Sequence, residues 1–129
     1  MSIVLVVDDE PLIRWAVREV LEGAGYGVIE AGSAREAMSR LATADGRPVA
    51  VALLDLRLPD SDDLTLLRQV RGHEPGCQVI MMTAHGTPEI LGEAVTAGAF
   101  STISKPFDLS SVVGLIRAAE QARPGHNHP

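Results

Sequence analysis

The chain has 129 residues, of which 46% are hydrophobic, and it carries a formal net charge of −6. This length suits one domain with a sizeable core, and the apolar content favours a folded protein over a disordered one. The acidic balance argues against direct contact with nucleic acid, because a surface that binds phosphates has to be basic.

No apolar stretch reaches the length of a membrane span, and the N-terminus lacks the basic start of a secretory signal. We therefore expect no contact with a membrane. The single cysteine, Cys77, cannot form an internal disulfide, which fits a cytoplasmic location. Composition predicts one domain over residues 1–122 and a flexible tail, or the start of a linker, over residues 123–129.

Apolar runs alternate with segments of helical periodicity along the whole chain. The runs predict strands at residues 3–7, 26–30, 49–54, 78–82 and 99–104. The periodic segments predict helices from residue 11 to 23, 34 to 42, 63 to 71, 88 to 97, and from residue 109 onward. Strands that are joined through helices run parallel, so we predict an α/β fold: a doubly wound five-stranded parallel sheet in three layers.

The predicted helix starts carry capping residues. Ser33 with Glu36 forms a capping box, and Thr87 precedes a proline at the first helical position. Asp108 is expected to cap the last helix. Each signal places a helix directly after a strand and its short loop.

Polar residues follow four of the predicted strands. Asp55 ends the most apolar run, and Asp8-Asp9, Thr83 and Lys105 end three others. In open α/β sheets this edge is where ligands bind. Adjacent carboxylates such as Asp8 and Asp9 repel each other unless a cation lies between them. Oxygen-only ligands favour a hard ion, and Mg²⁺ typically uses one or two protein carboxylates with a phosphate and several waters. From these residues alone, an acidic turn that complements a helix dipole is an equally good interpretation.

Taken together, a carboxylate, a cation position, a hydroxyl and an ammonium match the requirements of phosphoryl transfer. Asp55 would be the covalent acceptor. Each residue also has a simpler interpretation: Asp55 as a loop residue or cap, Thr83 as a β-branched strand terminus, and Lys105 as a solvated side chain beside Pro106. The Lys105-Pro106 bond is a candidate for the cis form.

The motifs VVDDEP, LLDLRLPD, MMTAHG and GAFSTISKPF resemble those of the receiver domains of two-component response regulators. The match covers residues 3 to 120. The segments IRW and TAHGTPE, with GAF, are similar to the receivers of enhancer-binding transcription activators. The resemblance implies a flavodoxin-like fold with strand order 2-1-3-4-5, and it makes residues 1–122 a receiver domain.

The resemblance also implies Mg²⁺-dependent transfer of a phosphoryl group from a phosphohistidine on a sensor histidine kinase. Asp55 would be the phosphoacceptor and a metal ligand. Asp8 and Asp9 would be the acidic metal pair, with Asp9 favoured as the direct ligand, and the backbone carbonyl of Arg57 would be a further ligand. Thr83 and Lys105 would hold the phosphoryl oxygens. Arg57 and His85 resemble positions that tune autodephosphorylation. Such a domain catalyses only its own phosphorylation and dephosphorylation, so it is not an enzyme acting on other substrates.

The implied output surface is the fourth helix, the fifth strand and the fifth helix, which would contact an output domain or a second copy of the chain. Gly92 and Gly114 fall inside these two helices, and each interior glycine costs a helix about 1 kcal/mol relative to alanine. We therefore expect this surface to be mobile before phosphorylation.

Two positions depart from the family pattern. Thr102 stands where an aromatic residue usually precedes the lysine by three positions, so the usual switch on the fifth strand is in doubt. Asp63 stands where many receivers carry glycine, within the acidic run DSDD. Aspartate tolerates a left-handed backbone better than most residues, so the fold is expected to survive.

Three other functions stay open. An aspartyl phosphatase or phosphotransferase often has a second aspartate two residues after the nucleophile, where this chain has Arg57. A flavin or nucleotide module would need Ser, Thr or Gly where Asp8-Asp9 stand. A degenerate receiver would act as an unphosphorylated interaction module, and Thr102 keeps that possibility open.

Overall fold

A computed structural model of the protein describes residues 2–43, 47–61, 63–84 and 86–123. Strands and helices alternate in the order β1 (Ile3–Val7), α1 (Pro11–Gly23), β2 (Gly27–Ala31), α2 (Ala34–Ala42), β3 (Val49–Asp55), α3 (Thr65–His73), β4 (Gln78–Thr83), α4 (Pro88–Thr96), β5 (Ser101–Ser104) and α5 (Leu109–Gln121). All four strand pairings are parallel, and the strand order is β2-β1-β3-β4-β5. The predicted doubly wound fold and its strand order are confirmed.

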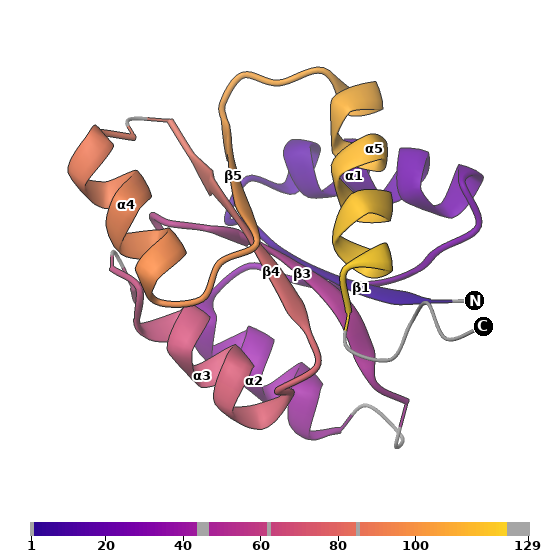
Figure 1. The fold of residues 1–129 in the computed structure, drawn as a ribbon. Helices are drawn as coiled ribbons and strands as arrows, with labels where there is room; N and C mark the ends of the chain where they lie inside the picture. The colour runs from indigo at the N-terminus through magenta and orange to yellow at the C-terminus, as the bar shows by residue number, and fades with distance from the viewer. Residues whose placement is uncertain (1, 44–46, 62, 85, 124–129) are drawn as a thin grey trace.

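The helices lie on both faces of the sheet, with α1 and α5 on one side and α2, α3 and α4 on the other (Figure 1). Side chains alternate along each strand, so each face has its own apolar cluster. In β1, Val4 and Val6 pack with α1 and α5, whereas Leu5 and Val7 pack with α2 and α3. The central strands β1 and β3 are buried on both faces, as continuous apolar runs require.

Two predicted caps are confirmed. The Ser33 hydroxyl accepts a hydrogen bond from the Glu36 N–H at 3.1 Å, and Thr87 accepts one from the Ile90 N–H at 3.3 Å. Asp108 occupies the N-cap position of α5, but its side chain makes no capping bond to the described residues. The predicted cap is therefore right in position and wrong in its hydrogen bond.

Some predicted boundaries shift because loops use residues assigned to strands. Gly25 has a φ of +97°, and the Tyr26 N–H donates to the Leu21 carbonyl at 3.0 Å, so Tyr26 closes α1 instead of opening β2. The same closure at Gly98 delays β5 to Ser101. Helix α3 begins two residues later than predicted, because Asp63 accepts the Thr65 N–H at 2.9 Å in the preceding turn.

The C-terminal end of α5 is hydrogen-bonded to the domain near the N-terminal ends of the strands, away from the polar residues at their C-terminal ends. The Tyr26 hydroxyl donates to Glu120 at 3.1 Å, and the Gln78 side chain donates to the Ala122 carbonyl at 3.0 Å. Arg123 also contacts the domain, but residues 124–129 of the predicted tail lie outside the described residues. Within the described ranges, every helix is too short or too polar to cross a bilayer.

Candidate phosphoacceptor site

Asp55 is the last residue of β3 and follows six buried apolar residues. The strand carries its carboxylate to the C-terminal edge of the sheet, where the side chain stays 8% exposed. The next loop turns back at once, because the Arg57 N–H donates to Asp55 Oδ1 at 3.0 Å. The carboxylate is therefore held by its own loop and keeps a small solvent-exposed fraction.

Lys105 joins two of the predicted acidic residues. Its Nζ donates to Asp8 Oδ2 at 2.6 Å and to Asp55 Oδ2 at 2.9 Å, and its side chain is 11% exposed. Lys105 directly follows β5, and its backbone N–H donates to the Thr83 carbonyl at 2.8 Å, which fixes the start of its side chain near the site. The Lys105-Pro106 peptide bond is cis, as the sequence allowed.

Asp8 has a partner for each of its polar groups. Its N–H donates to the Ala31 carbonyl at 3.1 Å, and its Oδ1 accepts the Glu10 N–H at 2.9 Å. Its carbonyl oxygen accepts a hydrogen bond from Arg14 Nη1 at 2.5 Å. Asp8 is fully buried, whereas Asp9 and Glu10 are exposed beside it.

The acidic side chains suit a hard divalent cation. Asp8, Asp9 and Glu10 each offer a carboxylate oxygen, and these atoms lie within 4.8 Å of one another. The hydrogen bonds described above use one lone pair on each oxygen of Asp8 and Asp55, and a carboxylate oxygen has two. An oxygen-only set with lone pairs to spare fits Mg²⁺, which uses few protein carboxylates and keeps several waters.

Burial and hydrogen bonding oppose each other in the ionisation of this site. Burial raises the pKa of Asp55 above its ordinary value, although Lys105 and the Arg57 N–H favour the carboxylate. Burial would lower the pKa of Lys105, but its bonds to Asp8 and Asp55 outweigh this effect and raise it. The ammonium therefore stays charged at neutral pH and neutralises part of the acidic cluster.

Four other residues were singled out from the sequence, and the structure describes three of them. Thr83 ends β4, the strand next to β3, and is 4% exposed. The loop after it packs closely, since a Cβ at Gly86 would lie 2.9 Å from the Thr83 methyl carbon. Arg57 is exposed, and His85 lies outside the described residues. Thr102 is half-buried in β5, paired in register with Met81.

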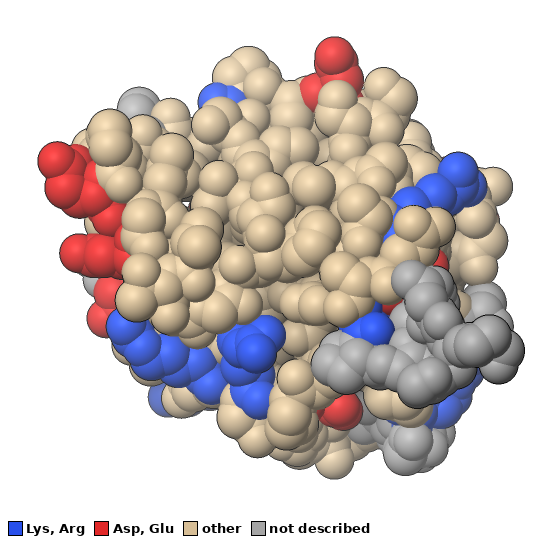
Figure 2. Space-filling view, viewed as in Figure 1, with Lys and Arg blue, Asp and Glu red and all other residues tan. Residues whose placement is uncertain are grey.

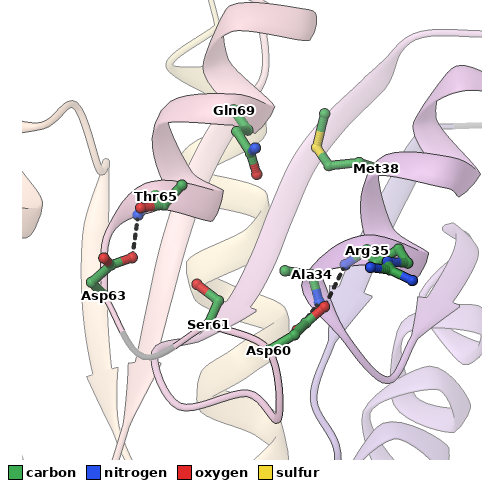
Figure 3. A pocket seen from close by; sticks show the side chains of 8 residues that line it. All are labelled: Ala34, Arg35, Met38, Asp60, Ser61, Asp63, Thr65 and Gln69. Carbon is green, nitrogen blue, oxygen red and sulfur yellow. Dashed lines mark hydrogen bonds between the residues drawn. The ribbon is translucent and has the colours of Figure 1, made fainter.

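The loop after Asp55 is attached to the start of α2 through Asp60, which lines a hollow between α2 and α3 (Figure 3). Asp60 accepts the N–H groups of Ala34 and Arg35 at 2.8 and 2.9 Å. These hydrogen bonds hold the pKa of Asp60 below its ordinary value. This attachment steadies the loop that contains Arg57.

Sequence reasoning missed Glu10, Arg14 and Asp60. Glu10 Oε1 lies 3.5 Å from Lys105 Nζ, and its position next to the acidic pair was the available signal. Arg14 and Asp60 act across loops through backbone groups, which no local pattern indicates.

The site thus places a buried carboxylate, held with a second carboxylate by one lysine, where the strand order of a doubly wound sheet reverses, which is the ligand-binding position of this class of α/β domain. The sequence model of the family described as "Response regulator receiver domain" matches residues 4–117. This match covers most of the chain, so the chain belongs to the response regulator receiver family.

Similar regulators come from several bacteria. The chain is 37% identical to the DNA-binding transcriptional regulator NtrC of Escherichia coli K12 over 118 residues, which are 92% of this chain and 24% of that protein. It is 34% identical to the C4-dicarboxylate transport regulator DctD of Rhizobium meliloti, over 93% of this chain and 25% of that one. The chain thus spans about a quarter of the length of these relatives.

Solved structures agree with the fold. A CheY-like receiver domain from Methanospirillum hungatei superposes with a TM-score of 0.85 at 28% identity, over 94% of each chain. The chemotaxis regulator CheY4 of Vibrio cholerae gives 0.81 at 28% identity, over 92% of this chain and 98% of that one.

Proposed function

We propose that the chain is a cytoplasmic phosphoacceptor domain in which Asp55 receives a phosphoryl group from a phosphohistidine of a sensor histidine kinase. The observation that carries this proposal is the pair of hydrogen bonds from Lys105 Nζ to Asp8 and Asp55. They bring together, at one strand edge, a partly accessible carboxylate and a fixed positive charge. Family membership supports the same function.

In the transfer step, an oxygen of Asp55 forms a bond to phosphorus. The bond from phosphorus to the imidazole nitrogen breaks, and its electron pair stays on the imidazole, which then takes up a proton. Lys105 is already placed to neutralise an incoming phosphoryl oxygen, and Thr83 would donate its hydroxyl to another. The chain itself mainly positions and neutralises, which is what phosphoryl transfer requires.

A bound Mg²⁺ would supply additional charge neutralisation between Asp55 and the phosphoryl oxygens. Asp8, Asp9, Asp55 and the Arg57 carbonyl would hold it. The spacing of the Asp8 and Asp9 carboxylates supports this pair as ligands. The shared hydrogen bonds of Lys105 bring Asp55 beside Asp8, and the Arg57 carbonyl is included on the family resemblance alone. We assign no enzymatic activity toward other substrates.

The rim beside the site offers a surface for the kinase. A groove of about 520 Å³ runs between the start of α1 and the loop before α5, with a mostly apolar lining and the charged residues Glu10 and Lys105 at the site. Leu12 borders it and is 81% exposed, and Trp15, one turn along, is 61% exposed. Lys105, which binds Asp55, also lines this groove, so we propose that a donor histidine approaches Asp55 along it. Leu12→Asp should therefore slow transfer from a phosphorylated kinase but leave phosphorylation by acetyl phosphate unchanged; equal slowing of both would argue against this docking surface.

A second surface, formed by α4, β5 and α5, is a candidate contact for an output domain. Viewed as in Figure 1, the region over α4, β5 and α5 is mostly uncharged, with acidic groups gathered at the α4 edge (Figure 2). Val95 is 59% and Phe100 36% exposed. The longer relatives, which include transcriptional regulators, favour an output domain in the same polypeptide as the occupant, as in an enhancer-binding activator. Dimerisation of this chain on phosphorylation, seen by sedimentation, would instead indicate a second copy.

The test is phosphorylation by acetyl phosphate with and without Mg²⁺, read by intact mass. We expect a gain of one phosphoryl group that requires Mg²⁺ and is lost in Asp55→Asn. Asp108→Asn is the matched control, because that exposed carboxylate makes no capping bond to the described residues. No gain under any condition would favour the second candidate, an unphosphorylated interaction module, which the half-buried Thr102 in place of an aromatic residue supports.

A further inference from the structure

Arg14 connects the first turns of α1 to the end of β1. Its Nη1 donates to the Asp8 carbonyl oxygen at 2.5 Å, and its side chain is only 20% exposed. That carbonyl belongs to the peptide unit that joins Asp8 to Asp9. The orientation of this peptide plane is therefore held from the helix.

The Asp8 carbonyl needs a donor from outside the sheet. The paired register of β1 ends at Val7 on both neighbouring strands, and Asp8 beyond it is fully buried. A buried carbonyl without a donor destabilises the fold. Arg14 supplies that donor, so it removes this destabilisation and fixes the point from which the exposed Asp9 side chain begins.

The Arg14 guanidinium has better hydrogen-bond geometry toward the Asp8 carbonyl than toward the Glu30 carboxylate. Arg14 Nε lies 3.4 Å from Glu30 Oε1, yet it has no hydrogen-bond acceptor among the described residues. Arg18 takes the other Glu30 oxygen at 2.8 Å. Gly32 leaves room for this arrangement, because a Cβ there would lie 3.2 Å from Arg14 Nη1.

We propose that Arg14 is a positioning residue for the cation site: it orients the Asp8–Asp9 peptide so that the Asp9 carboxylate stays beside those of Asp8 and Glu10. The inference rests on the proposed function and adds a residue that does not touch the cation itself. Outer groups that orient metal ligands typically change metal affinity 10–100-fold. Arg14 also repels a cation through its charge, which Glu30 partly offsets.

The charge of Arg14 and its hydrogen bond to the Asp8 carbonyl predict opposite changes in Mg²⁺ affinity when Arg14 is substituted. If Arg14 acted only through its charge, Arg14→Lys would bind Mg²⁺ like the wild type and Arg14→Met would bind it more tightly. If Arg14 positions the peptide, both variants lose the short bond to the Asp8 carbonyl, and the Kd for Mg²⁺ rises roughly tenfold. Arg18→Met is the matched control, since it removes a charge from the same helix and the same Glu30 partner without contact to Asp8.

The experiment is calorimetric titration of Mg²⁺ into the four proteins, together with the amide resonance of Asp9 in the metal-free state. We expect this resonance to move in Arg14→Lys and to stay in place in Arg18→Met. Phosphorylation by acetyl phosphate should need more Mg²⁺ in Arg14→Lys but reach nearly the wild-type rate at saturation. If Arg14→Met does not fold, Arg14→Lys decides alone.

Wild-type Mg²⁺ affinity in Arg14→Lys with tighter binding in Arg14→Met would overturn the inference and leave the proposed function intact. A wild-type chain that binds no Mg²⁺ would overturn both.

Discussion

Gly98→Ala tests the backbone at the turn between α4 and β5. Gly98 has a φ of +107°, and a Cβ there would lie 2.6 Å from Arg71 Nε. A left-handed backbone costs a non-glycine residue about 1–2 kcal/mol. Displacing Arg71 also breaks its 3.4 Å contact with the Cys77 carbonyl, worth up to about 1 kcal/mol.

Alanine also restricts the unfolded chain, which offsets about 0.4–1 kcal/mol of this loss. The net expectation is that the free energy of unfolding falls by about 1–2 kcal/mol. For a domain of this size, that lowers the unfolding temperature by roughly 4–7 °C. Circular dichroism during thermal unfolding measures it directly.

Gly92→Ala is the matched control, within the helix that this turn follows. Gly92 lies inside α4, and a Cβ there meets no described atom within 4 Å beyond its chain neighbours and the backbone of its own helix. Alanine should raise stability there by about 0.5–1 kcal/mol. Adding Arg71→Ala to Gly98→Ala separates the close contact from the backbone strain. A Gly98→Ala protein as stable as the wild type would refute the described turn.

Three further outcomes are expected. Asp60→Ala should lower the unfolding temperature at neutral pH, because two N–H groups at the start of α2 lose their acceptor. The folded pKa of Asp60 is depressed, so its stabilisation is present above the unfolded pKa and is lost as pH falls through the folded value. A difference between the two proteins that is as large in acid as at neutral pH would contradict this cause. Burial raises the pKa of Cys77 to about 12, so a disulfide reagent should modify it only after unfolding in urea; fast reaction of the folded protein would contradict its burial. Amides of α4 and α5 should exchange with solvent faster than those of α1, because each contains an interior glycine, and equal protection would contradict a mobile output surface.

Local patterns predicted the elements well because they depend on neighbours in the chain. The apolar run before Asp55 and the caps at Ser33 and Thr87 needed no knowledge of the rest of the fold. The convergence of Asp8, Asp55 and Lys105 also followed from sequence, since parallel strands end at one edge.

The errors came from residues with two competing uses. Tyr26 is an aromatic residue of a type common in strands, but its N–H donates to the Leu21 carbonyl at the end of α1. The strand β2 therefore begins one residue later, at Gly27. Contacts between distant segments had no sequence signal. The Asp60 bonds to α2 span 25 and 26 residues, and they depend on where the tertiary fold places two loops.

The two apolar clusters that flank the sheet share no side chain among the described residues. Substitutions in one cluster should therefore add to those in the other with little coupling. Helix α1, which carries Arg14, belongs to one cluster, and α4 packs in the other. The outward face of α4 can therefore change from one homologue to another while α1, and with it the Arg14 side chain that holds the end of β1, keeps its packing.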